Sequence, residues 1–209
     1  MNSVRHLLLA AAACAVISAC SDSKPPPAGA PGAATTASSA PGVASTTSSG
    51  STSASADAYD RAATGAGFTV GQMMSTHVVY VFFDPQCPHC SALWQASKPI
   101  LGQVRMVWIP VTLLNPKSVK QGAVLLASKD VVPAMDAHEA SISAGGGGIE
   151  PPANVPADLE EKVRANTKLM TGLGGDSVPF LVFKSPATGK PETFAGALPT
   201  ASLKQLLGI

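Results

Sequence analysis

Two cysteines lie three residues apart, Cys87 and Cys90, at a point where the pattern of the chain changes. The preceding run Val78–Phe83 is β-branched and aromatic, which is typical of a buried strand, and the following segment has helical character. Thiols spaced across one helical turn can close a small disulfide. The unpaired N–H groups and positive dipole at a helix start favour a thiolate on the first sulfur. The spacing therefore predicts a redox pair, with Cys87 as nucleophile and Cys90 as resolving thiol.

Other uses of a C-x-x-C pattern fit this sequence less well. A zinc site needs further ligands, yet from residue 57 onward the only histidines besides His89 are His77 and His138, and no second C-x-x-C occurs. Attachment of a c-type haem needs His directly after the second cysteine, where this chain has Ser91. A purely structural disulfide stays an alternative, although the spacing is tight for one. We therefore expect no metal and no cofactor.

The elements that must position the pair can be read from the same patterns. A strand, a helix and a second strand form a β-α-β unit, after which come a mostly helical stretch, a hairpin and a closing helix. Pro99 should end or bend the helix that carries the cysteines. The predicted strands are 68–70, 78–83, 104–109, 178–183 and 192–194, and the predicted helices are 88–100, 116–128, 132–143, 157–170 and 201–207. This order predicts an α/β, thioredoxin-like fold, with helices flanking a mixed central sheet and a helical insertion.

The first 19 residues are expected to form an export signal. A short basic start precedes an apolar stretch, Leu7–Ala19, which is shorter than the roughly 20 residues that span a membrane. The segment Ile17–Cys20 resembles the bacterial lipobox, so Cys20 is expected to be lipidated and to anchor the protein in the periplasm. An Asp directly after the lipidated cysteine would favour the inner membrane. This chain has Ser21 at that position, which favours the outer membrane. Alternatively, Cys20 is an ordinary thiol and the mature protein is freely soluble.

Residues 20–56 are then a disordered tether, because they are almost wholly Ser, Ala, Thr, Pro and Gly and offer no core. Residues 57–209 are long enough for one domain with a real core. The chain has 209 residues, 45% of them hydrophobic, and a formal net charge of +1. Neither a nucleic acid nor another strong polyanion is therefore expected as a partner.

The segment Tyr80–Cys90, YVFFDPQCPHC, resembles the active-site block of the periplasmic disulfide isomerases and reductases DsbC and DsbG, with DsbG the nearer. The resemblance extends over the rest of the predicted domain. It continues through Leu125–Asp130, Pro152–Pro156, Lys168–Met170 and Leu173–Gly174.

This resemblance implies a protein-disulfide oxidoreductase that acts on cysteine-containing envelope proteins. It makes Cys87 the attacking thiol and Cys90 its partner. It also makes Pro179 a cis-proline whose loop faces the disulfide, with the Val178 backbone free to pair with an extended substrate. A trans proline at the start of an edge strand is the alternative. For Asp84 the resemblance implies a role in shaping the turn, although proton transfer is also conceivable.

The chain departs from this family in two respects. First, DsbC and DsbG carry an N-terminal dimerisation domain, whereas here the corresponding region is the predicted tether. We therefore expect a monomer, without the dimer cleft that supports isomerase and chaperone activity in that family. Second, Pro88-His89 is the dipeptide of the oxidase DsbA, and Val178 also resembles DsbA. An imidazole at position 89 favours the Cys87 thiolate, which stabilises the reduced state and makes a stronger oxidant.

The direction of electron flow depends on partners. A DsbD-type electron donor would make the protein a reductant of disulfides or sulfenylated cysteines, and a DsbB-type oxidant would make it a DsbA-like oxidase. A third hypothesis is a binding module whose dithiol is a redox-gated latch. The remaining conspicuous side chains are expected to be structural, Trp94 and Trp108 in the core and His77 and His138 at the surface or with satisfied hydrogen bonds.

Overall fold

The computed structural model describes residues 58–209. The predicted signal peptide, the predicted lipidation site Cys20 and the predicted tether lie outside the described residues, and so does Asp57. Residues 58–62 are helical and lead into the sheet. No helix in the part of the chain that the structure describes is long and apolar enough to cross a bilayer.

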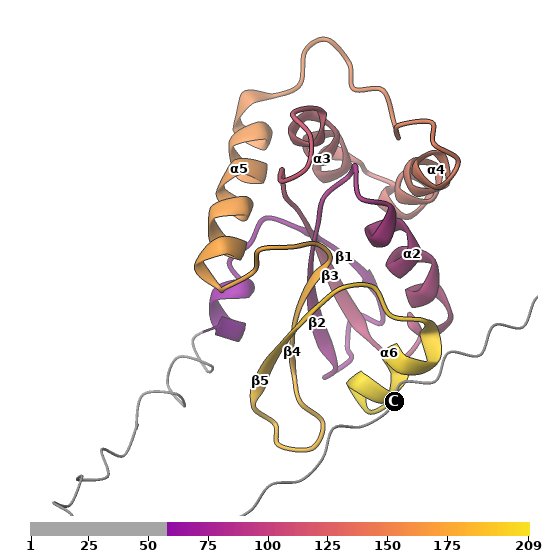
Figure 1. The fold of residues 1–209 in the computed structure, drawn as a ribbon, viewed down its shortest axis with the longest axis vertical. Coiled ribbons are helices and arrows are strands. Elements are labelled where there is room, and N and C mark those ends of the chain that lie inside the picture. Colours follow the sequence, from indigo (N-terminus) through magenta and orange to yellow (C-terminus); the bar gives the residue numbers. More distant parts are fainter. Residues whose placement is uncertain (1–57) are drawn as a thin grey trace, which may run out of the picture. The chain divides into compact units, whose positions relative to one another are not determined.

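The described residues form an α/β domain around one five-stranded sheet with the order β1-β3-β2-β4-β5 (Figure 1). The central strands β2 and β3 are parallel, in a register that sets Val81 opposite Trp108, while the other neighbouring strands pair antiparallel. The sheet is therefore mixed, as the sequence predicted. The strands are β1 (Phe68–Gly71), β2 (Val78–Phe83), β3 (Arg105–Pro110), β4 (Phe180–Lys184) and β5 (Pro191–Ala195).

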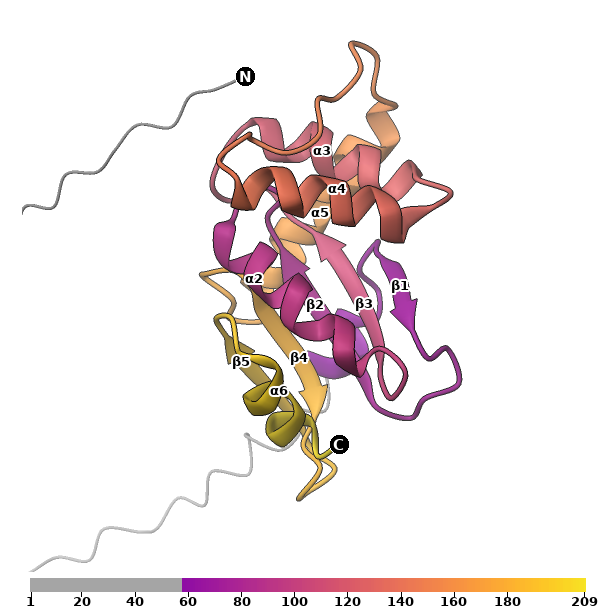
Figure 2. The same ribbon diagram turned by 90° about the vertical axis from the view of Figure 1, so that its right-hand side faces the viewer.

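Helices cover both faces of the sheet. Figure 1 shows α2 and α6 on one side and α5 on the other. Figure 2 shows α3 and α4 beyond the C-terminal ends of β2 and β3, the end of the sheet at which β2 leads to the cysteines. The helices are α2 (Pro88–Ser97), the 3-10 turn η1 (Lys98–Ile100), α3 (Lys117–Ala127), α4 (Val131–Ser143), α5 (Ala157–Gly172) and α6 (Thr200–Leu207).

The core follows the two-residue period of β2. Alternate residues of this strand face opposite layers, so that Val81 and Phe83 pack with α2 and α6 while Tyr80 and Phe82 pack with α5. Trp94 and Trp108 are fully buried in the first layer, with their rings edge to face at 5.1 Å between centroids, as expected for core residues. Burial on both faces explains why β2 is an almost unbroken apolar run.

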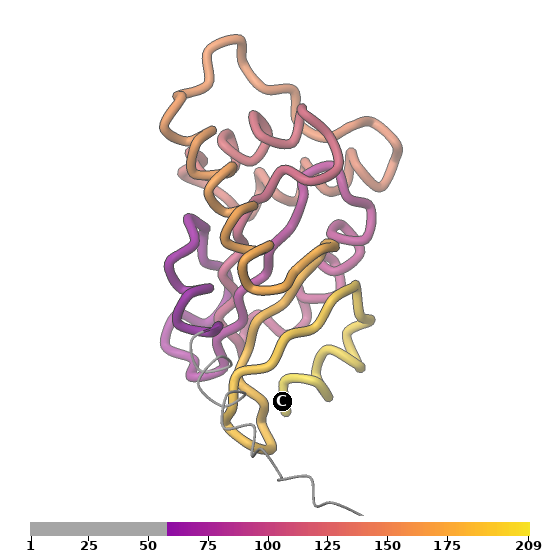
Figure 3. Tube along the Cα trace, turned by 60° about the vertical axis from the view of Figure 1, so that its left-hand side comes forward, coloured from indigo at the N-terminus to yellow at the C-terminus, as the bar shows by residue number. Residues whose placement is uncertain are grey.

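The predicted elements are confirmed, with small shifts at their ends. The largest shift is in α2, which stops at Ser97 and continues as a 3-10 turn around Pro99, because proline cannot complete the α-helical hydrogen-bond pattern. The last predicted strand pair is a hairpin, β4 with β5. The trace in Figure 3 shows the chain passing from α5 into this hairpin and returning along it as α6.

Candidate active site

Cys87 is the N-cap residue of α2. Its backbone is extended (φ −96°, ψ 114°), Pro88 occupies the first turn, and the Cys87 carbonyl accepts hydrogen bonds from the N–H groups of Cys90 and Ser91 at 3.0 and 3.2 Å. Proline suits this position because its fixed φ matches the first turn and its missing N–H is not needed there. The local sequence therefore places the Cys87 sulfur at the start of the helix, where N–H groups have no helical partner.

Several donors stabilise the thiolate of Cys87. Both cysteines are free thiols. The pKa of Cys87 falls to about 6, chiefly because the Cys90 thiol donates a hydrogen bond to it. Burial opposes this shift, while the backbone N–H groups of Cys90 and His89 and the charge of the His89 imidazole add to it. At neutral pH this sulfur is therefore mostly a thiolate, the reactive form.

Cys90 has the opposite character. It is fully buried, and burial raises its pKa well above that of a free thiol. The hydrogen bond to Cys87, the charge of Cys87 and the charge of Glu139 raise it further. At neutral pH one sulfur is thus mostly a thiolate, whereas the other keeps its proton.

The Val178–Pro179 loop lies against the nucleophile. The peptide bond is cis, and the carbonyl oxygen of Val178 lies 3.6 Å from Cys87 Sγ, which donates a hydrogen bond to it when Cys87 is protonated. An open hollow of about 350 Å³ lies beside this contact. It is lined by His89, Ser177, Val178, Ala195, Gly196 and Ala197. A peptide segment in this hollow would lie next to Cys87 Sγ.

A buried carboxylate shapes the turn that leads to Cys87. Asp84, at the end of β2, is fully buried, and its carbonyl accepts a hydrogen bond from the Cys87 N–H at 2.9 Å. Its side chain accepts four more, from the N–H groups of Gln86, Leu113 and Leu114 and from Ser118 Oγ, at 2.6 to 2.8 Å. This geometry agrees with the turn-shaping role implied by the resemblance.

His138 supports the same turn from α4. It is fully buried, with Nε2 2.7 Å from the carbonyl oxygen of Pro85 and Nδ1 3.1 Å from the N–H of Ile149. Because Nδ1 accepts, Nε2 carries the proton and donates. Burial lowers the pKa of His138, which favours this neutral ring. The prediction of a hydrogen-bonded, structural histidine is confirmed.

The glycine-rich loop after α4 is tied to the residue preceding the nucleophile. Gln86 Nε2 donates to the carbonyl of Gly147 at 2.9 Å and to Gln121 Oε1 at 2.5 Å, and Gln121 also donates to Gly147. The helical insertion therefore holds the active-site turn through side-chain hydrogen bonds. Sequence reasoning had singled out neither glutamine.

Sequence reasoning also missed Glu139. Its carboxyl is fully buried, and burial raises its pKa to about 8, with the charge of Cys87 adding to the shift. A signal was present, because the buried residues of α4 are Met135, His138, Glu139 and Ile142, the spacing of one helical face. An acidic residue on the buried face of a helix is rare unless it is paired or functional.

The structure brings together most of the predicted site residues. Cys87, Cys90 and the Val178–Pro179 loop meet, whereas Pro88 and His89 lie exposed at the rim. His77 is exposed at the other end of β2. Among residues 58–209 no group of three or more His, Cys, Asp or Glu side chains is arranged to hold a metal ion.

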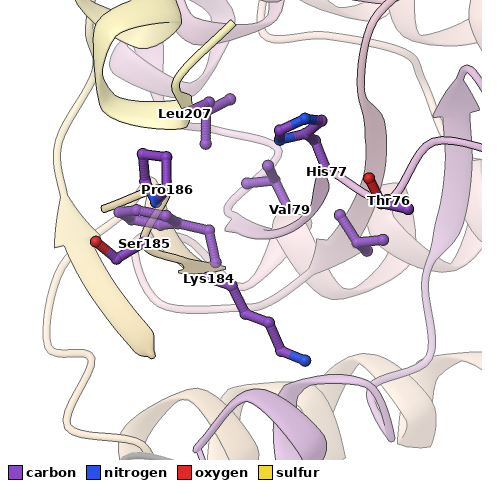
Figure 4. A pocket seen from close by; sticks show the side chains of 9 residues that line it. Thr76, His77, Val79, Lys184, Ser185, Pro186 and Leu207 are labelled. Carbon is purple, nitrogen blue, oxygen red and sulfur yellow. The ribbon is translucent and has the colours of Figure 1, made fainter. Parts of the chain in front are cut away.

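A second pocket lies at the end of the sheet away from the cysteines. It has a volume of about 170 Å³, and among its lining residues are His77, Lys184 and Leu207 (Figure 4). The Lys184 side chain extends away from the other labelled residues, and its Nζ lies 4.7 Å from the centre of the Tyr59 ring. Lys184 is the only lysine or arginine among the residues that line this pocket, and neither Cys87 nor Cys90 lines it.

Comparison with known proteins identifies the relatives of this site. The thiol:disulfide interchange protein DsbG of Pseudomonas aeruginosa is 32% identical over 140 residues, which are 66% of this chain and 54% of that protein. DsbG of Escherichia coli is 36% identical over 110 residues, 52% of this chain and 44% of that protein. The chain is DsbG-like over this region. It spans about half the length of these relatives, and no protein-family model matches it.

Solved structures identify the fold. A periplasmic thioredoxin-like protein from Salmonella enterica serovar Typhimurium superposes with a TM-score of 0.56 at 17% identity, covering 68% of this chain and 88% of that one. The catalytic domain of Proteus mirabilis ScsC gives 0.59 at 17% identity, covering 75% and 96%. The predicted thioredoxin-like fold is confirmed.

Proposed function

We propose that this DsbG-like domain is a thiol:disulfide oxidoreductase that exchanges disulfides with cysteine-containing proteins of the cell envelope. The observation that carries the proposal is the contrast between the two sulfurs. Cys87 has a pKa of about 6 and lies under the Val178 carbonyl, while Cys90 is fully buried with a pKa raised well above its usual value. The DsbG relatives support the same activity.

The geometry supports a two-step exchange. The Cys87 thiolate attacks one sulfur of a substrate disulfide, a bond forms between the two sulfurs, and the electron pair of the broken bond leaves with the other substrate sulfur. Cys90 then loses its proton and attacks Cys87 Sγ, which forms the internal disulfide and releases the second substrate thiolate. The substrate gains two electrons and the dithiol is oxidised. With a sulfenylated cysteine, the first leaving group is hydroxide, released as water.

Cys90→Ala tests this proposal, because it leaves the first step and removes the second. Purified variant and wild-type protein are incubated with periplasmic extract, and mixed disulfides are separated on non-reducing gels. We expect several adducts with Cys90→Ala, few with the wild type and none with the double variant Cys87→Ala/Cys90→Ala. A redox-gated latch would instead trap a single partner, and the absence of adducts would rule out exchange chemistry.

Two observations favour opposite directions of exchange. A nucleophile with a low pKa stabilises the reduced dithiol, a property of oxidants, and the exposed His89 beside it favours this second candidate, a DsbA-like oxidase. The DsbG likeness supports the reducing direction. The in-cell redox state distinguishes the two after acid quenching and thiol alkylation. A mostly reduced pair indicates a DsbD-type electron donor, and a mostly oxidised pair indicates a DsbB-type oxidant.

We further propose that the protein is exported, lipidated at Cys20 and held as a monomer in the periplasm, on the outer membrane. The lipobox-like segment Ile17–Cys20 and Ser21 support the anchor and the membrane, and the composition of residues 20–56 supports a tether. Cys20→Ala should move the protein from the membrane fraction to the soluble fraction. Light scattering of residues 57–209 should give the mass of one chain, and twice that mass would contradict the monomer.

A further inference from the structure

Glu139 lies next to the dithiol on α4, which is joined to α2 by side-chain hydrogen bonds. Trp94 Nε1 of α2 donates to Asp136 Oδ1 at 2.7 Å, and Asp136 also pairs with Lys98 Nζ at 2.7 Å. One turn further along α4, the carbonyl of Glu139 accepts a hydrogen bond from Ser91 Oγ at 2.8 Å. Ser91 directly follows Cys90, so this bond fixes Glu139 beside the resolving cysteine.

The carboxyl group of Glu139 is buried without a hydrogen-bond partner. Its side chain is fully inaccessible, and neither Oε1 nor Oε2 has a hydrogen bond to any atom of the described residues. The Ser91 hydroxyl approaches it and lowers its pKa, but the hydrogen bonds of that hydroxyl go to the Glu139 main chain and to Ser143 Oγ. An unpartnered buried carboxyl is costly for folding, which is a reason to look for a role in function.

Glu139 and the two sulfurs interact electrostatically. Burial raises the pKa of Glu139 to about 8, Ser91 lowers it, and the negative charge of Cys87 raises it. In return, a charged Glu139 raises the pKa of Cys90. A base whose pKa lies near the working pH is the kind best suited to accept a proton.

The exchange reaction requires such a group. Cys90 is fully buried and must lose a proton before it can attack. Two other titratable groups near the turn have no capacity to spare, since the Asp84 carboxylate already accepts four hydrogen bonds and both ring nitrogens of His138 are engaged. The charge of Lys117, on α3, lowers the pKa of His138, and Lys117 also forms an ion pair with Glu150. His89 is exposed.

We propose that Glu139 accepts the proton of Cys90 when Cys90 attacks the mixed disulfide. This inference rests on the proposed exchange function. The proton moves from Cys90 Sγ to the Glu139 carboxylate, the new bond joins the two cysteine sulfurs, and the electron pair of the broken bond leaves with the substrate thiolate. The carboxyl oxygens lie beyond hydrogen-bond distance of Cys90 Sγ, so the proton crosses through one water molecule or after a rotation of the Glu139 side chain.

The charge of Cys87 determines when Glu139 can accept the proton of Cys90. While Cys87 is a thiolate, its charge favours the protonated, neutral form of Glu139. Once Cys87 is bound to substrate its charge is gone, and the carboxylate becomes easier to form. The base is thus generated at the step that needs it.

A two-step thiol probe separates the steps. Reduced protein that carries Cys14→Ala and Cys20→Ala, so that Cys87 and Cys90 are its only thiols, is mixed with dithiobis(nitrobenzoate), and the coloured thiolate is followed by stopped flow from pH 6 to 10. The first release reports attack by Cys87, and the second reports resolution by Cys90. For Glu139→Gln we expect an unchanged first release at neutral pH and a second release slowed about tenfold or more. The difference should shrink as the pH rises towards that of Cys90 ionisation, because hydroxide then removes the proton.

The outcomes separate this inference from the proposed function. A wild-type protein that gives no second release contradicts the exchange function itself. A second release in Glu139→Gln at the wild-type rate, or one slowed equally at every pH, overturns the role of Glu139 alone. Glu161→Gln, which makes the same chemical change at an exposed position of α5, is the matched control and should behave like the wild type.

A measurement that keeps Glu139 covers the case in which Glu139→Gln does not fold. In the wild type the second release should rise with pH through an inflection well below the ionisation of Cys90. Ser91→Ala should move this inflection to higher pH, because Ser91 lowers the pKa of Glu139. A wild-type profile that rises only with the ionisation of Cys90, or an inflection that Ser91→Ala leaves in place, would contradict the proposal.

Discussion

Ser118 Oγ donates a 2.6 Å hydrogen bond to Asp84 Oδ1, which ties the start of α3 to the end of β2 three residues before Cys87. The other oxygen of this carboxylate accepts the N–H groups of Leu113 and Leu114, in the loop after β3. Two parallel strands and the helical insertion are therefore joined at one buried charge. This clamp fixes the position of the nucleophile relative to the rest of the domain.

Asp84→Asn should destabilise the domain. The substitution replaces an acceptor by an amide whose NH₂ group faces donors, so that several buried N–H groups lose their partner. We expect the free energy of unfolding to fall by about 3 kcal/mol, since hydrogen bonds to a buried charged group are worth more than neutral ones. Urea unfolding measures the loss. Asp130→Asn, at an exposed position with no capping bond, is the control, and an equal loss in both variants would contradict the clamp.

The low pKa of Cys87 should depend on Cys90. The rate of alkylation by iodoacetamide should follow an ionisation near pH 6 in the wild type and one at higher pH in Cys90→Ala, because the Cys90 thiol is the strongest contributor to the low pKa. Cys90→Ser keeps an O–H donor and should fall between the two. An unchanged midpoint in Cys90→Ala would assign the low pKa to the helix start instead.

The order of elements could be predicted because the domain follows local rules closely. β2 is buried on both faces and reads as an apolar run, and Pro88 and Pro99 mark the two ends of the helix between the central strands. The C-x-x-C spacing predicts a redox pair at the start of that helix, where the structure places the two thiols. The fold and the dithiol were therefore accessible from sequence.

The partners of the dithiol were not accessible in the same way. Gln121 and Glu139 lie more than 30 residues along the chain from the cysteines, and only the packing of α3 and α4 over the sheet end brings them close. The spacing on α4 showed which residues share a face, but not that the face is turned towards α2. Hydrogen bonds of this kind depend on tertiary structure.

His89→Ala should make the dithiol more reducing. His89 is exposed, so its loss should leave the stability of the fold unchanged, while the charge that helps to lower the pKa of Cys87 disappears. The effect should be modest, because His89 acts more weakly than Cys90 and the backbone N–H groups. We expect the reduction potential to fall by about 30 mV or less, which corresponds to roughly one pKa unit. Equilibration with glutathione measures it, and an unchanged or higher potential would contradict the prediction.

His138 should make the stability of the domain depend on pH. Burial lowers its pKa in the folded state below the usual 6.5, so at mildly acidic pH the unfolded chain binds a proton that the folded domain does not. Stability from this group is therefore complete above pH 6.5 and falls as the pH drops below it, with a limiting slope of about 1.4 kcal/mol per pH unit. Glutamine at position 138 retains an N–H donor for the Pro85 carbonyl but cannot titrate. Urea unfolding between pH 5 and 8 should thus show a flatter profile for His138→Gln than for the wild type, with His77→Gln as the control for loss of an exposed histidine. Parallel profiles for His138→Gln and the wild type would mean that the buried ring does not titrate on unfolding.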